Sequence, residues 1–223
     1  MIIAIDGPAG SGKSTVAKQV ARELGFHYLD TGAMYRSVTA TALAADVDVH
    51  DEDAVARIAR EQPIAFAHEE NSPMPCAVSI GGRDVTGEIR TAPVDATVST
   101  VSAHPAVREA LVAQQRAIAA SDDVVMEGRD IGTVVFPDAQ LKVFLTADAE
   151  CRARRRALQN AERGAGETDV ELLCAQIRKR DAMDSTREVA PLKPAADARM
   201  LDTTDMGIDE VVAAIADWAR ELS

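Results

Sequence analysis

The chain opens with an apolar run, Ile2–Asp6, that leads directly into the eight residues GPAGSGKS, Gly7–Ser14. These residues match the pattern G-x-x-x-x-G-K-[ST] in full. Apolar residues then recur with helical spacing from Lys13 to Leu24, and Gly25 stands where such a helix would end. A strand, a glycine-rich turn and a helix in this order predict a phosphate-binding loop, or P-loop, at the start of an α/β fold.

Each residue type in this loop suits an anionic ligand. Glycine lets backbone N–H groups come close to a ligand, and the following helix presents its free N–H groups and positive dipole end to the same place. Lys13 supplies a point charge for β and γ phosphates, and Ser14 supplies a hydroxyl ligand for Mg²⁺. Thr15 adds a second hydroxyl.

The rest of the chain alternates between short apolar runs and helical patterns. Strands are expected at 2–6, 123–127, 141–146 and 198–202, and helices at 13–24, 32–45, 51–61, 105–120, 149–162, 169–182 and 208–221. Strand and helix in turn predict an α/β fold with a largely parallel sheet. The length of 223 residues suits one domain with an insertion.

Residues 62–93 break this rhythm. They contain three prolines before Cys76, a Gly81–Gly82 pair and alternating apolar residues. This pattern predicts a small antiparallel excursion inserted into the α/β core, with a disordered surface loop as the alternative.

Composition excludes several classes of protein. The net charge of -12 argues against general nucleic-acid binding, which uses a basic face. No run approaches the roughly 18 apolar residues of a membrane span. The three cysteines, Cys76, Cys151 and Cys174, are odd in number and lack CxxC spacing, so we expect no disulfide framework and a reducing cytoplasm. The four histidines form no HExxH motif, which leaves a zinc site with little support.

A P-loop fixes the nucleotide but not the use made of it, so a switch-type GTPase and a small-molecule kinase both remain open. Guanine-specific switches carry an N-K-x-D motif, but neither Asn71 nor Asn160 is followed by lysine. A D-x-x-G motif occurs at Asp84–Gly87, inside the excursion, where no core strand precedes it. The switch interpretation is therefore weak.

The kinase interpretation gains from the arginines. Residues 152–180 hold seven arginines and one lysine against four acidic residues, a local net charge of +4. Arg152, Arg155 and Arg156 fall on one face of the expected helix, and Arg178 and Arg180 lie on the next helix, beyond the RGAGE turn at 163–167. Two basic helices joined by a glycine-bearing hinge suit a lid that closes over phosphates, because the guanidinium fork matches phosphate oxygens.

Further arginines follow the expected strands and glycines. Arg36 lies one turn beyond Gly32, and Arg129 with Asp130 comes directly after a buried strand. The carboxyl ends of parallel strands are where ligands bind in such sheets. Arg187 follows Asp184 near the end of the basic helices.

Taken together, these segments make the chain resemble the bacterial cytidylate kinases over nearly its full length. The resemblance is carried by IDGPAGSGKST, YLDTGAMYR, DVTGEIR, VSAHPAVREAL, GRDIGTVVFPDA, RDAMDSTREVAPL and ARMLDTT. Many NTPases share the P-loop, whereas GRDIGTVVFPDA and the excursion ending in GEIRT are much more specific. The resemblance implies a three-layer α/β P-loop NTPase fold with a central five-stranded parallel sheet, a monophosphate-binding insertion and an Arg-rich lid.

The resemblance also implies an organisation and a reaction. The chain would be a single nucleoside monophosphate kinase domain, with a core at 1–31, 121–149 and 187–223, a monophosphate-binding region at 32–120 and a lid at about 150–186. It would transfer the γ-phosphoryl group of ATP to CMP or dCMP with Mg²⁺. It would act on these small molecules as a cytoplasmic monomer, with no nucleic-acid or membrane partner.

The family's functional residues carry over by position. ATP would be held by Gly7, Pro8, Ala9, Gly10, Ser11, Gly12, Lys13, Ser14 and Thr15. The catalytic cations would be Lys13, Arg129, Arg155, Arg156 and Arg180, with Arg152 a further lid candidate. The acceptor would be bound by Thr31, Tyr35, Arg36, Ser99, Arg108, Arg129, Asp130, Asp184 and Arg187. Within that set, Arg36 and Arg129 would grip the phosphate, Ser99, Arg108 and Asp130 would read the cytosine, and Asp184 and Arg187 would hold the ribose.

Two positions depart from the family pattern. Thr31 stands where serine is usual, which keeps the hydroxyl but adds a methyl group at the monophosphate site. Glu127 stands where aspartate is usual, one methylene longer, which alters its reach toward a Mg²⁺-bound water beside Ser14. An AMP- or shikimate-type kinase on the same fold, and a non-enzymatic nucleotide switch, remain as alternatives.

Overall fold

The computed structural model describes residues 1–69, 72–120, 122–164 and 166–222. Its centre is a five-stranded sheet in the order β2-β6-β1-β7-β8, in which every neighbouring pair is parallel. The strands are β1 (Ile2–Asp6), β2 (His27–Asp30), β6 (Val124–Gly128), β7 (Leu141–Thr146) and β8 (Arg199–Asp202). The expected α/β fold with a parallel central sheet is therefore confirmed.

Side-chain alternation along β1 gives the sheet two buried faces. Ile3 and Ile5 pack on one face with apolar residues of α1 (Lys13–Leu24) and α8 (Ile208–Arg220). Ala4 lies in a separate cluster on the other face with Met126 and Ile131. Because both faces are covered, β1 is a nearly continuous apolar run, as central parallel strands are.

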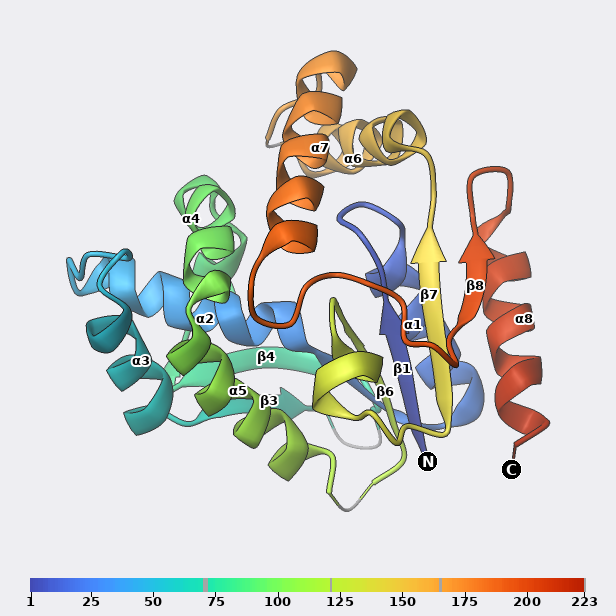
Figure 1. The fold of residues 1–223 in the computed structure, drawn as a ribbon, viewed down its shortest axis with the longest axis horizontal. Coiled ribbons are helices and arrows are strands. Elements are labelled where there is room, and N and C mark those ends of the chain that lie inside the picture. The colour runs from blue at the N-terminus through green and yellow to red at the C-terminus, as the bar shows by residue number, and fades with distance from the viewer. Residues whose placement is uncertain (70–71, 121, 165, 223) are drawn as a thin grey trace.

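A second group of elements lies on the side of the sheet away from β8 (Figure 1). It contains α2 (Thr31–Ala44), α3 (Glu52–Glu61), α4 (Ala92–Ala103), α5 (Pro105–Ile118), the short 3₁₀ turn η1 (Glu88–Arg90) and a small antiparallel sheet of β3 (Ile64–His68), β4 (Pro75–Ile80) and β5 (Arg83–Asp84). The excursion expected at 62–93 is thus confirmed as antiparallel, except that its residues 70 and 71 lie outside the described part of the chain.

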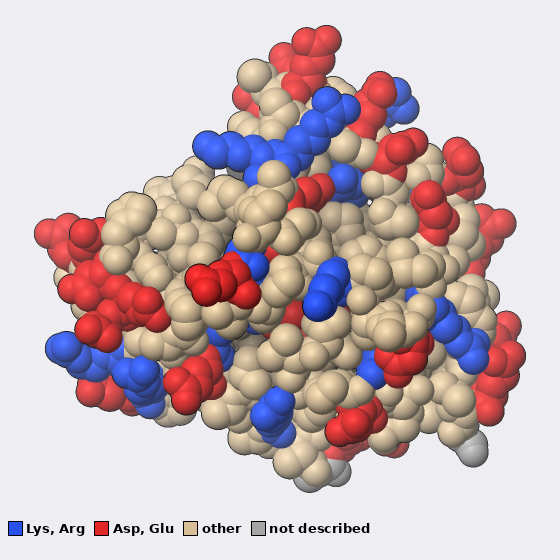
Figure 2. Space-filling view, viewed as in Figure 1, with Lys and Arg blue, Asp and Glu red and all other residues tan. Residues whose placement is uncertain are grey.

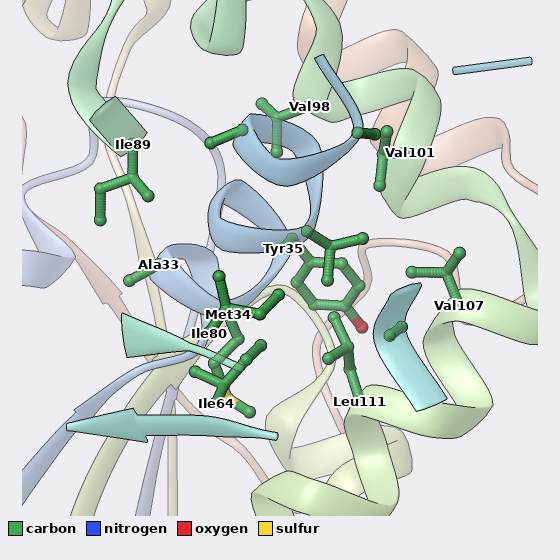
Figure 3. Close-up of a cluster of buried hydrophobic side chains, with 14 of the residues drawn as sticks. Ala33, Met34, Tyr35, Ile64, Ile80, Ile89, Val98, Val101, Val107 and Leu111 are labelled. Atoms are coloured by element: carbon green, nitrogen blue, oxygen red, sulfur yellow. The ribbon is translucent and has the colours of Figure 1, made fainter. Parts of the chain in front are cut away.

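These elements share a core of their own. Tyr35 of α2 lies among Val98 and Val101 of α4 and Val107 and Leu111 of α5 (Figure 3). Leu111 is fully buried, and the Tyr35 residue is 8% exposed. This apolar cluster holds the second group together and is separate from the clusters on the two faces of the central sheet.

The helices α6 (Ala149–Arg163) and α7 (Val170–Thr186) lie beyond the carboxyl ends of β1 and β7 (Figure 1). They pack on each other through Ala153, Ala157, Leu173 and Ile177. This is the pair expected to form the lid. The turn expected to act as its hinge includes residue 165, which lies outside the described residues.

Three elements differ from the expectations drawn from the residues. β2 was not located from the residues because HYLD is only four residues long and its first residue is exposed. α4 was missed because Val and Thr are poor helix formers, and its formation depends instead on burying Val94, Val98 and Val101. α7 continues to Thr186, four residues beyond the expected end at 182.

The turn at Ile131–Val135 (η2) is a single π-helical turn, a form often found at functional sites.

Within the described ranges, every helix is too short or too polar to cross a membrane.

The separate core of the second group can be tested with two truncations on α5. Leu111→Ala removes a fully buried side chain, and we expect it to lower the free energy of unfolding by about 2–5 kcal/mol because it leaves a cavity. Ile118→Ala on the same helix removes a 36% exposed side chain and should cost about 1 kcal/mol or less. Urea unfolding followed by circular dichroism measures both, and equal losses would contradict this assignment of the core.

Candidate functional site: a phosphate-binding loop facing an arginine cluster

The P-loop joins the carboxyl end of β1 to α1 through three glycines with positive φ, namely Gly7, Gly10 and Gly12. Gly12 caps α1 with φ at 88°, in the left-handed region. Gly7 has φ at 150°, and a Cβ added there would lie 2.0 Å from the backbone carbonyl oxygen of Leu145 on β7. Gly7 is therefore required by the close approach of two main chains, not by flexibility.

Lys13 lies buried beneath this loop. Its Nζ donates hydrogen bonds to the carbonyl oxygen of Pro8 at 2.7 Å and to Ser11 Oγ at 3.3 Å. Burial, followed by the positive charge of Arg129, lowers the pKa of Lys13 to about 7. A bound phosphate would relieve both effects, because it brings negative charge to a desolvated ammonium group.

The end of β6 brings a carboxylate to the start of α1. Ser14 Oγ donates to Glu127 Oε2 at 2.9 Å, and the Tyr28 hydroxyl donates to Glu127 Oε1. Burial, together with the charge of Asp30, raises the pKa of the Glu127 carboxyl. The Glu127 side chain thus lies beside the Ser14 hydroxyl of the P-loop. Together they place several oxygen atoms where a magnesium ion was expected.

A hydroxyl and a carboxylate are ligands that suit Mg²⁺, which usually keeps several waters and binds one or two protein groups plus the phosphates of its nucleotide. Within the described residues, no cluster of three or more His, Cys, Asp or Glu side chains could hold a metal ion alone. The hydroxyl of Ser14 and the carboxylate of Glu127 therefore fit a Mg²⁺ ion that arrives with a nucleotide.

Helix α2 directs further polar side chains toward the same end of the sheet. Thr31 Oγ1 donates to the carbonyl oxygen of Glu127 at 2.7 Å, so the methyl-bearing residue ties α2 to β6. Arg36 donates from Nη1 to the Ile89 carbonyl at 2.9 Å and from Nη2 to Asp95 Oδ1 at 2.5 Å.

The residues expected to read a base come together in part. Arg108 of α5 and Asp130 after β6 form a buried ion pair, and the Arg108 guanidinium carbon lies 5.5 Å from the centre of the Tyr35 ring. Arg187 Nη2 is 3.8 Å from Asp130 Oδ1, beyond hydrogen-bonding distance. Ser99 is half-buried on α4, and its carbonyl oxygen accepts a bond from Ser102. The structure thus unites Arg108, Asp130, Tyr35 and Arg187, and does not connect Ser99 to them through a hydrogen bond.

A second ion pair lies between this group and the P-loop. Arg129 Nε donates to Asp184 Oδ2 at 2.9 Å. Arg180 lies nearby on α7, and among the described residues its buried Nε finds no hydrogen-bond partner. Burial, and then the charge of Arg129, lowers the pKa of Arg180 to about 10. This unpaired buried donor marks a place where an anion would be stabilised.

The three arginines expected on one face of α6 have three different sets of partners. Arg152 is buried and bonds to the carbonyl oxygens of Ala147 and Ala9 and to Asp181. Arg155 donates to the hydroxyl and carbonyl oxygen of Thr203. Arg156 Nη2 lies 3.5 Å from Asp95 Oδ2. Of the three, Arg156 approaches α4 through Asp95, while Arg152 connects α6 to the P-loop at Ala9.

Sequence reasoning missed several carboxylates and one arginine of the site. Asp6 ends β1 and accepts the backbone N–H groups of Ile131 and Gly132, both at 2.8 Å, and burial raises its pKa to about 6. Arg90 of η1 pairs with Asp30 at 2.9 Å, beside the Tyr28 and Glu127 pair. An acidic residue closing an apolar strand was the available signal for Asp6, and the arginine in GEIRT was the signal for Arg90.

Comparison with known proteins decides the family. The family model described as Cytidylate kinase matches residues 3–221. A cytidylate kinase of Shouchella clausii is 52% identical over 221 residues, covering 99% of this chain and 96% of the relative. One from Mycobacterium avium is 49% identical over 224 residues, covering 100% of this chain and 96% of the relative.

The chain belongs to the cytidylate kinase family. A crystal structure of an uncharacterized protein from Eubacterium ventriosum is also similar, with a TM-score of 0.51 at 12% identity, covering 99% of this chain and 98% of that one. At this identity the likeness concerns the fold alone. In this member of the cytidylate kinase family, the P-loop lies next to the arginine cluster, since the charges of Arg129 and Arg180 act on Lys13.

The close approach at Gly7 gives a sharp test of the loop. We expect Gly7→Ala to abolish ATP binding and lower stability, because its methyl group would collide with the Leu145 carbonyl and force β1 and β7 apart. Gly25→Ala is the matched control, since Gly25 has a positive φ of 71° and open space around it, and should cost only about 1–2 kcal/mol. Calorimetric titration with ATP and thermal unfolding measure the two effects, and normal ATP binding by Gly7→Ala would refute the assignment.

Proposed function

We propose that the chain transfers the γ-phosphoryl group of ATP to CMP or dCMP, giving ADP and CDP or dCDP. The observation that carries this proposal is the buried lysine of the P-loop facing arginines from α2, α7 and the segment after β6. One cationic surface lies at the loop that would hold ATP, and the other lies where family position assigns the acceptor phosphate. Two polyanions can thus be held next to each other.

The chemistry needs no nucleophile from the protein. An oxygen of the acceptor phosphate attacks the γ-phosphorus, a new O–P bond forms, and the bond to the oxygen bridging the β and γ phosphorus atoms breaks, which leaves ADP. The protein's contribution is to position the two nucleotides and neutralise their charge. Lys13 and Arg180 suit this role because their charged groups are buried, where electrostatic stabilisation is strong.

The acceptor would be held by three sets of residues. Its phosphate would bind Arg36 and Arg129, with Thr31 close by. Its ribose would meet Asp184 and Arg187. Its cytosine, which offers an amino donor beside ring-nitrogen and carbonyl acceptors, would be read by the Arg108–Asp130 pair on the Tyr35 side, with Ser99 from α4.

The donor side would consist of the P-loop, Gly7–Thr15, with Mg²⁺ at Ser14 and Glu127 acting through a metal-bound water. When bound, Mg²⁺ supplies charge neutralisation between the β and γ phosphates. Arg155 and Arg156 of α6 complete the proposed set of catalytic cations. Because Arg155 is engaged with Thr203 in this conformation, its role requires α6 to change position.

We further propose a monomer that works in the cytoplasm. The support consists of the family resemblance and the three free cysteines, Cys76, Cys151 and Cys174, which fit a reducing compartment.

The experiment that tests the proposed function offers the protein Mg-ATP with CMP, dCMP, UMP, AMP and GMP separately and measures initial rates of phosphoryl transfer. Turnover largely restricted to CMP and dCMP is the expected result. Turnover centred on another nucleotide would void the assignments of Ser99, Arg108 and Asp130. Slow ATP hydrolysis with no transfer to any acceptor would overturn the proposed reaction.

The role of Lys13 can be isolated by substitution. We expect Lys13→Ala to lower kcat for CMP phosphorylation by about 10²–10³, because one preorganised cation next to the transferring group is lost. Arg22→Ala removes an exposed cation from the last turn of the same helix and should leave kcat unchanged. Near-normal turnover by Lys13→Ala, measured in a coupled assay for ADP, would contradict the proposed mechanism.

A further inference from the structure

Asp95 is an acidic residue among the arginines of the acceptor side. It lies in the first turn of α4, and its two carboxylate oxygens have different partners. Oδ1 is 2.5 Å from Arg36 Nη2, and Oδ2 is 3.5 Å from Arg156 Nη2. Arg36 comes from α2 and Arg156 from α6, so one carboxylate connects the acceptor region with the helix pair beyond the strand ends.

The surroundings of Asp95 are those proposed for the acceptor phosphate. Its charge, with that of Asp184, opposes the lowering of the Arg180 pKa that burial, Arg129 and Arg36 produce. The carboxylate of Asp95 therefore acts on three arginines, Arg36, Arg156 and Arg180. A carboxylate and a phosphate present similar pairs of oxygens to a guanidinium group, so each can occupy the other's place.

The Asp95 side chain is also exposed enough to move away from its arginine partners. It is 37% exposed, whereas the neighbouring Asp184 and Asp130 carboxylates are 8% and 6% exposed. A partly exposed carboxylate that loses its arginine is readily hydrated, while a buried one is left with an uncompensated charge. Among these acidic residues, Asp95 is the one whose ion pair can be exchanged at low cost.

We propose that Asp95 is an internal competitor of the acceptor phosphate, which holds Arg36 and Arg156 until a nucleoside monophosphate displaces it. This inference rests on the proposed function, because it requires Arg36 to bind the acceptor phosphate. The displacement favours acceptors that carry a phosphate dianion, since its two charges outweigh the single charge of the carboxylate. It also means that acceptor binding breaks the contact between Arg156 of α6 and Asp95 of α4.

A supporting role for Asp95 would have the opposite sign. If its carboxylate served to orient Arg36 for the phosphate, removing the charge would weaken acceptor binding. If it competes with the phosphate, removing the charge strengthens binding. The direction of one measured change therefore separates the two roles.

The test is calorimetric titration with CMP in the absence of ATP, on the full chain and on Asp95→Asn. We expect the Kd for CMP to fall about three- to fivefold, in the range that a partly exposed ion pair contributes. Glu88→Gln is the matched control, because it removes one negative charge from a nearby exposed pair with Arg83 and should leave the Kd unchanged. Asp95→Ser, a second variant without the charge, should shift the Kd in the same direction as Asp95→Asn.

An unchanged or higher Kd in folded Asp95→Asn and Asp95→Ser would overturn the inference. Failure of both variants to fold, judged by circular dichroism, would assign Asp95 a structural role and overturn it as well. Turnover of CMP by the unchanged chain is measured alongside. Absence of that turnover would overturn the proposed function and this inference together, whereas normal turnover with no tightening in the variants would overturn the inference alone.

Discussion

The geometry of the site depends on the hydrogen bonds that the buried carboxylate of Asp6 accepts. Asp6 ends β1 at the point where the P-loop begins, and it accepts the backbone N–H groups of Ile131 and Gly132 in the turn that follows β6. The two loops that would hold donor and acceptor are therefore fastened to each other through one side chain. Because Arg129 and Asp130 immediately precede that turn, their distance from the P-loop is set by this contact and by the pairing of β1 with β6.

Charge pairing inside the molecule holds the arginines of the site in place in a protein that is acidic overall. The chain has a net charge of -12, and acidic side chains lie along both margins of the face in Figure 2, while Lys and Arg side chains gather over α7. In the site, Arg108, Arg129 and Arg152 each pair with an aspartate. Such pairs hold the guanidinium groups in place before a nucleotide arrives, which lowers the entropy that binding would otherwise cost.

Much of the fold followed from the sequence because its signals are local. The P-loop, α1, α5 and the alternation of strands and helices were all readable from spacing and from glycine and proline positions. β2 and α4 were not located, since the first is too short to show a pattern and the second forms through burial of its valines against its own propensity.

The residues of the site likewise fall into those that the sequence identifies and those that it does not. Motif positions such as Lys13, Ser14, Arg36 and Asp130 could be named from the sequence, because each has a fixed place in a recognisable segment. Their partners could not be named: Asp95 meets Arg36 across 59 residues and Asp181 meets Arg152 across 29. Those contacts depend on how whole helices pack, which the spacing of residues along one helix does not report.

The tie between α6, α7 and Ala9 makes the donor loop sensitive to events far from it. Arg152 of α6 donates to the Ala9 carbonyl at 2.9 Å, Asp181 of α7 accepts the Ala9 N–H at 3.3 Å, and the two side chains bond to each other at 2.6 Å. The residue Ala9 of the P-loop is thus bonded through both its N–H and its carbonyl oxygen to the helices that follow the sheet. Any rotation of these helices relative to the P-loop either carries Ala9 along or breaks both of its hydrogen bonds, so the shape of the loop depends on the position of the two helices.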